Sequence, residues 1–177
     1  MRQTIFSIVS LLAVLSFIVW WIMKDEETVL QDNVIIPAYD ESTNPNDTTE
    51  DATTSLNLSN QGLTKVPDYV FSRSSLMSLD LSGNKLSGAL PAEIRHLSNL
   101  KNLDLSDNDF TGVPAEIGQL TSLESLDLSH NQITGLPYEL GNLVNLKTLR
   151  LVGNDYSKAD LEVIKRELPA SVIIEIE

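Results

Sequence analysis

Four stretches of eleven residues decide the fold of this chain: LMSLDLSGNKL (76–86), LKNLDLSDNDF (100–110), LESLDLSHNQI (123–133) and LKTLRLVGNDY (146–156). They begin 24, 23 and 23 residues apart, and a weaker copy, LNLSNQGL (56–63), lies one period upstream. A fixed period of this length is typical of a solenoid, in which each repeat packs only against its neighbours. The pattern therefore predicts a broad exposed surface rather than a deep pocket.

Each copy is expected to contain a short strand, because apolar and polar residues alternate with a period of two. In the first full copy, Leu79 and Leu81 alternate with Ser78, Asp80 and Ser82. The leucines are expected to face a core and the polar residues to face water, while neighbouring copies stack as a parallel sheet. Apolar residues that flank the strands complete this core: Leu76, Leu86, Leu100, Phe110, Leu123, Ile133, Leu146 and Tyr156.

An asparagine recurs where the chain turns after each strand. The four positions are Asn84, Asn108, Asn131 and Asn154, and Gln61 takes this place in the weaker first copy. An inward-facing amide donates and accepts at once, so it satisfies backbone groups of its own turn and of the neighbouring repeat. We therefore predict a structural role for these asparagines rather than ligand binding.

The segments that return to the next strand each open with a proline. These prolines are Pro67, Pro91, Pro114 and Pro137, followed three residues later by Val70, Ile94, Ile117 and Leu140. Because proline fixes φ near the helical value, it favours the start of a short helical or 3₁₀ segment. The pattern predicts one such segment per repeat on the convex side of the solenoid.

The last segment, residues 157–177, is expected to cap the array. Ser157 and Asp160 have the spacing of a capping box, which predicts a helix over Ala159–Leu168. Its apolar face is expected to hold Leu161, Ile164 and Leu168, with Val163 beside it. The closing residues SVIIEIE (171–177) predict a final strand that covers the open edge of the last repeat.

Nineteen residues without a charge, IFSIVSLLAVLSFIVWWIM (5–23), follow a short N-terminal tail, residues 1–4. At about 1.5 Å per residue they match the hydrocarbon core of a bilayer, so they predict a transmembrane helix and contact with lipid. The alternative is a cleaved signal peptide, but the segment ends in bulky residues rather than in a small-residue cleavage site. Cleavage would release a secreted repeat protein.

Residues 24–52 are polar, acidic and proline-containing, which predicts an extended, disordered linker between the membrane and the repeats. The repeats occupy residues 53–156, about 4.5 copies. Arg2 and Lys24 place one base on each side of the apolar segment, so the positive-inside rule gives no preference. A short basic tail favours a cytoplasmic N-terminus, with the repeats outside the cell membrane.

Composition excludes several classes of function. The net charge is −13, which disfavours nucleic-acid binding because phosphates are repelled. Cysteine is absent and histidine occurs twice, so thiol chemistry is excluded and histidine chemistry nearly so. We find no catalytic motif, and we therefore predict no enzyme activity, no cofactor and no metal site.

These repeats resemble the leucine-rich repeat family, whose pattern LxxLxLxxNxL is followed by xxLPxxIxxL. The resemblance covers about residues 53–156 and implies a parallel sheet on the concave face and protein binding as the usual role. It therefore implies an α/β repeat solenoid, an arc with a C-terminal capping helix, here preceded by one transmembrane helix. The copy LSGALPAEIRHL (86–97) looks like the plant receptor type. Secreted eukaryotic members usually carry cysteine-bridged caps, so a chain without cysteine is better explained as a bacterial membrane protein.

Water-facing positions of successive strands are expected to form three columns on the concave face. The first runs Asn57, Asp80, Asp104, Asp127 and Arg150. The second runs Ser55, Ser78, Asn102, Ser125 and Thr148, and the third runs Ser59, Ser82, Ser106, Ser129 and Val152. Adjacent strands lie about 4.8 Å apart, so the three aspartates are expected to form a ladder of like charge. Arg150 ends this ladder and is expected to pair with Asp127.

Candidate binding residues are the members of the first two columns in the full copies: Ser78, Asp80, Asn102, Asp104, Ser125, Asp127, Thr148 and Arg150. The acidic strip suits a basic protein segment or, less well, a divalent cation. The alternative is that these residues are simply the common solvent-exposed residues of this repeat and bind no ligand. Two functions remain open. One is a membrane-tethered interaction module that binds a protein or a cell-envelope ligand. The other is an architectural or self-associating cell-envelope protein.

Overall fold

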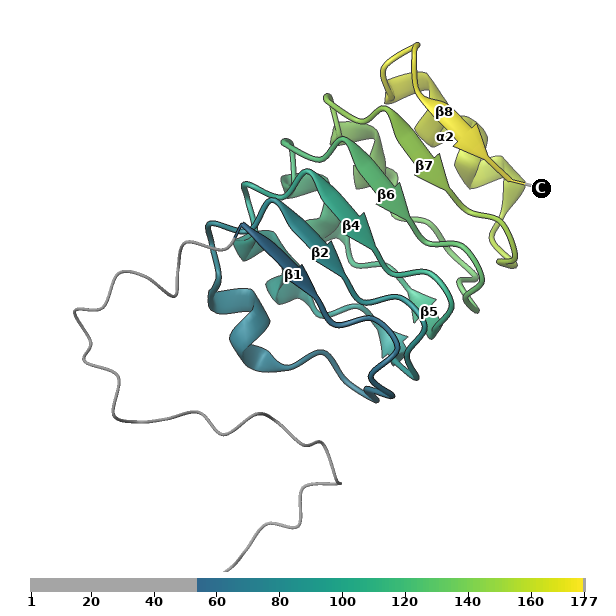
Figure 1. Cartoon of the computed structure of the whole chain (residues 1–177). Coiled ribbons are helices and arrows are strands. Elements are labelled where there is room, and N and C mark those ends of the chain that lie inside the picture. The colour runs from purple at the N-terminus through teal and green to yellow at the C-terminus, as the bar shows by residue number, and fades with distance from the viewer. Residues whose placement is uncertain (1–53, 177) are drawn as a thin grey trace, which may run out of the picture. The chain divides into compact units, whose positions relative to one another are not determined.

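The computed structural model describes residues 54–176, which form one continuous stack of repeats (Figure 1). Six strands make a sheet in the order β1-β2-β4-β6-β7-β8, and every neighbouring pair is parallel. The strands are β1 (Ser55–Asn57), β2 (Ser78–Asp80), β4 (Asn102–Asp104), β6 (Ser125–Asp127), β7 (Thr148–Arg150) and β8 (Ile173–Glu175). The predicted repeat solenoid with a parallel sheet is confirmed.

The repeat period sets the register of this sheet. Asn102 pairs with Ser78 on one side and with Ser125 on the other, so equivalent positions of successive copies lie side by side. The central leucines of the inner strands are therefore all directed into the core, and each is at most 2% exposed: Leu79, Leu103, Leu126 and Leu149. Leu56 and Ile174 in the two edge strands are only partly buried, because each has a neighbouring strand on one side alone.

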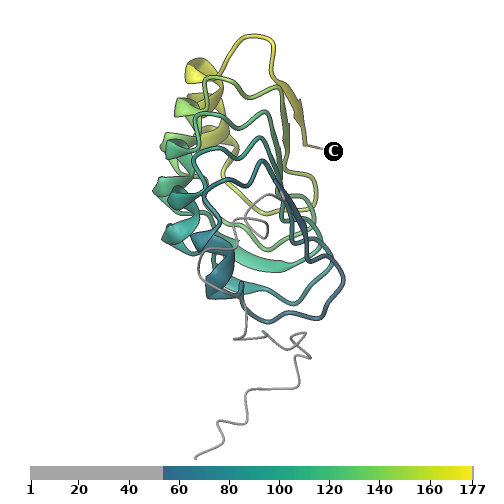
Figure 2. The same ribbon diagram turned by 60° about the vertical axis from the view of Figure 1, so that its left-hand side comes forward.

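A row of short 3₁₀ helices covers the core on the side opposite the strands, as Figure 2 shows. The helices are η2 (Asp68–Ser72), η3 (Ala92–His96), η4 (Ala115–Gln119) and η5 (Tyr138–Asn142). Each begins directly after a proline whose φ lies between −75° and −58°, as the sequence predicts. One aliphatic residue per helix is fully buried: Val70, Ile94, Ile117 and Leu140.

Two glycines allow the later helices to pack closely. A Cβ on Gly118 in η4 would lie 2.4 Å from the backbone oxygen of Glu139 in η5. A Cβ on Gly141 in η5 would lie 2.6 Å from the Cβ of Glu167 in the capping helix. Since real Cβ contacts are not this short, both positions require glycine for the helical layer to keep its spacing.

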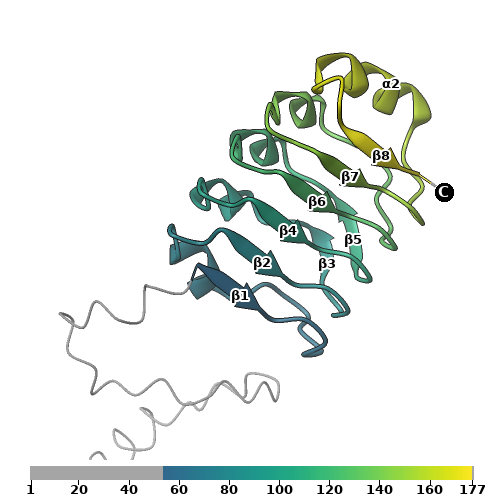
Figure 3. The same cartoon turned by 45° about the horizontal axis from the view of Figure 1, so that its top comes forward.

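A second, smaller sheet on the flank of the stack was not predicted. It consists of β3 (Ser87–Ala89) and β5 (Asp109–Gly112), which are parallel and lie between the main sheet and the helices, as Figure 3 shows. The residues SGA and DFTG lack an apolar alternation that would identify strands. Gly88 has a φ of +77° and lies beside a shift of register, so glycine fits this irregular pairing.

The C-terminal cap has the predicted parts, with small differences. Helix α2 spans Lys158–Glu167, one residue earlier than predicted, and the Ser157 hydroxyl accepts a hydrogen bond from the Asp160 amide at 3.3 Å. Leu161, Ile164 and Leu168 are buried against the last repeat, whereas Val163, which was placed beside them, is 42% exposed. Strand β8 then pairs with β7 and ends the sheet.

The residue before each turn asparagine, and before Gln61 in the first copy, adopts a left-handed backbone conformation. These residues are Asn60, Gly83, Asp107, His130 and Gly153, with φ between 51° and 71°. Glycine, asparagine, aspartate and histidine tolerate this region better than other residues. Each repeat therefore reverses direction at the same place by the same backbone conformation.

The predicted tail, transmembrane helix and linker, residues 1–52, lie outside the described residues. Within residues 54–176, no helix is long and apolar enough to cross a membrane.

Candidate interaction surface

The turn asparagines form a buried ladder that ties each repeat to the previous one. In Asn131, Oδ1 accepts from the Phe110 amide at 3.0 Å, and Nδ2 donates to the carbonyls of Leu105, Leu128 and Ser129 at 3.0–3.1 Å. Corresponding bonds are made by Asn84, Asn108 and Asn154. No buried side-chain polar atom in the described residues lacks a partner, so these amides are fully used in the fold.

The first copy departs from this ladder. Gln61 was expected in the asparagine column, but its side chain is exposed and only its backbone amide takes part, by donating to Asn84 Oδ1 at 3.0 Å. The ladder therefore starts at Asn84, which also accepts from the Leu63 amide at 3.0 Å.

The face of the six-stranded sheet that points away from the helices, hereafter the open sheet face, carries the predicted columns. The first column runs Asn57, Asp80, Asp104, Asp127 and Arg150, and Glu175 of β8 extends it. The second runs Ser55, Ser78, Asn102, Ser125 and Thr148, and Ile173 extends it. The sequence interpretation missed both β8 residues, although the alternation of VIIEIE (172–177) is the signal that would have placed them.

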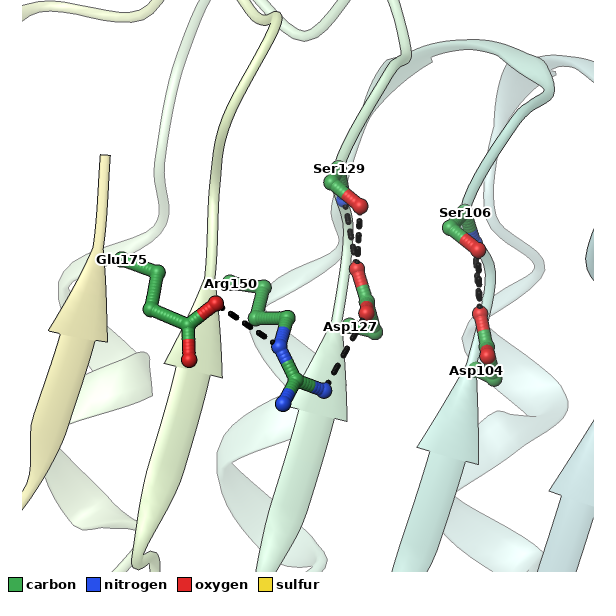
Figure 4. A network of polar contacts seen from close by, with 6 residues as sticks. All are labelled: Asp104, Ser106, Asp127, Ser129, Arg150 and Glu175. Atoms are coloured by element: carbon green, nitrogen blue, oxygen red, sulfur yellow. Dashed lines mark hydrogen bonds and ion pairs between the residues drawn. The ribbon is translucent and has the colours of Figure 1, made fainter. Parts of the chain in front are cut away.

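Every aspartate of the first column uses one carboxylate oxygen inside its own repeat. Oδ1 of Asp104 accepts from the Ser106 amide at 3.0 Å and from the Ser106 hydroxyl at 2.6 Å (Figure 4). Equivalent pairs are Asp80 with Ser82 and Asp127 with Ser129. These bonds hold the chain as it leaves each strand, because a side chain that bonds two residues onward stabilises a turn.

The serines of the third column correct one expectation. Ser106 and Ser129 were predicted to face water, but each is only 8% exposed. They are buried because their hydroxyls and amides both bond to the aspartate two residues earlier. The third column therefore belongs to the turn, and the exposed surface is formed by the first two columns.

The C-terminal end of the first column is an ion-pair network, which Figure 4 shows. Arg150 Nη1 lies 3.4 Å from Asp127 Oδ2, as the sequence predicts, and Arg150 Nε donates to Glu175 Oε2 at 2.9 Å. Hydrogen bonding and charge from Glu175, followed by the charge of Asp127, raise the pKa of the Arg150 guanidinium. Asp127 thus has a cationic partner within the chain, although it shares Arg150 with Glu175.

The other two aspartates keep a carboxylate oxygen available. Within residues 54–176, Oδ2 of Asp80 and Oδ2 of Asp104 make no hydrogen bond or ion pair, and both side chains are partly exposed. The two residues are direct partners in adjacent parallel strands, whose backbones lie about 4.8 Å apart. The part of the acidic strip without a cationic partner therefore consists of Asp80 on β2 and Asp104 on β4.

A second charged row lies where the strands begin. Glu124 is placed between Lys101 and Lys147 of the flanking repeats, with Oε1 3.6 Å from Lys101 Nζ and Oε2 bonded to Lys147 Nζ. The hydrogen bond and charge of Lys147, and then the charge of Lys101, lower the pKa of the Glu124 carboxyl. This row has more base than acid, so it borders the acidic strip with positive charge.

Residues 54–176 contain no group of three or more histidine, cysteine, aspartate or glutamate side chains placed to hold a metal ion. A surface pocket of about 500 Å³ lies between η2 and η3, lined by Asp68, Phe71, Ser72, Pro91, Glu93 and His96. His96 and His130 are both exposed.

Comparison with known proteins agrees with this geometry. Receptor-like protein 18 of Arabidopsis thaliana is 42% identical over 57 residues, which cover 32% of this chain but only 7% of that protein. A leucine-rich repeat protein of Leptospira interrogans is similar in structure, with 41% identity, a TM-score of 0.59, and coverage of 64% of this chain and 28% of that one.

The plant peptide hormone receptor RGFR1, solved in complex with RGF2, is 33% identical with a TM-score of 0.58. The match covers 71% of this chain and 24% of the receptor. The family model described as "Leucine-rich repeat region" matches residues 54–172, more than half of the chain. Together with the repeated strands, the asparagine ladder and the row of 3₁₀ helices, this match shows that the chain belongs to the leucine-rich repeat family.

Proposed function

We propose that this protein is a non-catalytic interaction module whose open sheet face, the concave face of the solenoid, binds a basic segment of another protein. The observation that carries the proposal is the pair of unpaired carboxylate oxygens on Asp80 and Asp104, held on rigid neighbouring strands. A positively charged side chain at this place gains two acceptors that the fold leaves unused. Asn102 and Ser125, in the second column, supply further polar groups beside them.

The rigidity of the site supports recognition of an extended chain. Both aspartates are oriented by two hydrogen bonds from a serine, so their free oxygens do not need to be ordered when a ligand binds. Ser78 and Thr148, in the second column, extend the polar surface along the sheet. RGFR1, a peptide hormone receptor, is similar in structure over 71% of this chain, which supports a peptide-like ligand here.

Neutralising the two aspartates tests the proposal without disturbing the fold. Asn57 occupies the first column in β1, and its Oδ1 accepts from the Ser59 amide at 2.9 Å and from the Ser59 hydroxyl at 2.8 Å. An asparagine therefore makes the same turn bonds as the aspartates do. The double variant D80N/D104N removes charge while keeping those bonds, and D109N/D155N removes two exposed aspartates elsewhere as a matched control.

The assay is fluorescence anisotropy of a labelled octapeptide of alternating arginine and glycine, with the full chain in a mild detergent. Two exposed ion pairs of about 0.2–1 kcal/mol each predict a roughly two- to thirtyfold loss of affinity in D80N/D104N at low salt. Added salt should reduce the difference between the variants. An equal effect of D80N/D104N and D109N/D155N would exclude the open sheet face as the site.

We further propose that residues 5–23 anchor the protein in the cell membrane as a single-pass helix, with the N-terminus in the cytoplasm and the repeats outside. The length and lack of charge of this segment support the anchor. Protease added to intact cells should then remove the repeats, whereas protection of the repeats would contradict this orientation. Mass spectrometry of the mature N-terminus tests the alternative of signal cleavage and secretion.

A further inference from the structure

Large apolar side chains are exposed only towards the two ends of the solenoid. Between residues 78 and 137 the described structure exposes none of them, whereas residues 54–77 and 138–176 together expose seven. Five of the seven lie at the C-terminal end: Tyr138, Val144, Val163, Ile173 and Ile176. Exposed apolar groups gathered in one region mark interaction surfaces more often than groups that are scattered singly.

The repeat supplies an internal comparison for one of these residues. Ile173 is 62% exposed and stands in the second column, where every other copy has a polar residue: Ser55, Ser78, Asn102, Ser125 and Thr148. The repeat architecture therefore does not require an apolar residue here. The change to isoleucine occurs only in β8, the strand whose far side has no partner in the described sheet.

The free edge of β8 has backbone groups ready to pair. The Ile173 amide donates to the Lys147 carbonyl, and the Glu175 carbonyl accepts from the Leu151 amide, so both residues direct their backbone groups toward β7. Because backbone groups alternate in direction along a strand, the N–H and C=O of Ile174 point to the free edge. An exposed strand edge of this kind is a template for pairing with another chain.

The apolar side chains on the core side of this edge are self-complementary. Val172, Ile174 and Ile176 alternate onto the core side of the strand, where Val172 and Ile174 are partly buried and Ile176 is 42% exposed. If a second β8 runs antiparallel with Ile174 at the centre, Ile174 meets its own counterpart and Val172 meets Ile176. On the open sheet face, Ile173 then lies opposite Glu175. A surface that matches itself in reverse is what a two-fold interface requires.

We propose that β8 forms an antiparallel pair with β8 of a second copy of this chain, which joins the two sheets around a two-fold axis at Ile174. This pairing satisfies the free N–H and C=O groups of Ile174 in both copies and encloses the apolar row on the core side. Val163 on α2 is the exposed apolar residue of the helical layer in the same cap. Head-to-tail pairing of β8 with β1 of the next copy is open-ended and places Thr54 opposite Val172, whereas the two-fold pairing closes at two copies and places Ile176 there.

Disulfide trapping tests this arrangement directly, because the chain contains no cysteine. In an antiparallel pair, hydrogen-bonded residues opposite each other have Cα atoms about 5.5 Å apart, within the range that a disulfide spans. The full chain carrying I174C, in mild detergent under mild oxidation, should therefore form a covalent dimer. L56C, at the equivalent core position of β1, should remain monomeric.

Two further outcomes decide the question. Cross-linking of a mixture of I174C and L56C, without cross-linking of I174C alone, would show head-to-tail assembly and overturn the two-fold pairing. In sedimentation of the cysteine-free chain, I176E should abolish the dimer, whereas M77E should not. Met77 is 43% exposed at the opposite end and so matches Ile176 as a control. A monomer at all concentrations, or equal loss of the dimer in I176E and M77E, would also refute the proposal.

Discussion

Substitution of Asn131 by alanine measures what the asparagine ladder contributes. The Asn131 side chain satisfies the Phe110 amide and three carbonyls, those of Leu105, Leu128 and Ser129. Each of these carbonyls keeps another donor after the substitution. The remaining donors are Asn108 Nδ2, Asn154 Nδ2 and the Asp107 amide. Only the Phe110 amide is left without a partner, in a buried position.

One orphaned buried amide costs about 1–3 kcal/mol, and the loss of the buried side chain adds to this. Asn99→Ala is the control, because Asn99 donates to the Ser74 carbonyl at 2.9 Å but is exposed, so water replaces the bond. We expect N131A to lower the free energy of unfolding by at least about 1–3 kcal/mol, and N99A by less than about 1 kcal/mol. Urea denaturation of the full chain, followed by circular dichroism in mild detergent, measures both. Equal costs for N131A and N99A would refute the structural role of the ladder.

Two other predictions concern the helical layer and the charged row. Gly118→Ala should lower the unfolding free energy by about 1–3 kcal/mol, because its Cβ would meet the backbone of Glu139. Gly135→Ala, whose Cβ meets nothing within 4 Å, should be neutral or stabilising in the same urea denaturation. Equal losses of stability in the two variants would contradict the close packing. The pKa of Glu124 is lowered, so its ion pairs contribute stability above the ordinary carboxyl pKa and lose it as pH falls through the lowered value. NMR titration should show this pKa rising in K147Q, and an unchanged pKa would remove Lys147 as its cause.

The sequence predicted the sheet well because one physical constraint fixes it. Each repeat must place its leucines against those of the next repeat, so the period alone determines which residues are strand partners. The pairing of Asp104 with Asp80 and with Asp127 was predicted in this way, and so was the contact of Asp127 with Arg150. Burial of the leucines follows from the same alternation.

Features that depend on hydrogen bonding between nearby residues were not predictable from alternation. Ser106 occupies a position that period two assigns to water, but its bonds to Asp104 draw it into the turn. Strand β3 contains serine, glycine and alanine, whose side chains carry no pattern, and it forms only because a neighbouring flank segment lies beside it. In both cases the deciding partner is identified by geometry rather than by residue type.

The comparison of Asn57 with the aspartates separates architecture from charge in the first column. Asn57 bonds to Ser59 as Asp80 and Asp104 bond to their serines, so the turn requires a side-chain oxygen but not a negative charge. Like charges directly opposite each other in adjacent strands are destabilising. Aspartate at these two positions therefore costs stability that asparagine would avoid, whereas Asp127 has Arg150 as a cationic partner that it shares with Glu175. The negative charges of Asp80 on β2 and Asp104 on β4 are neither required by the turn nor neutralised by a neighbouring base. We therefore place the binding of a basic partner at these two residues.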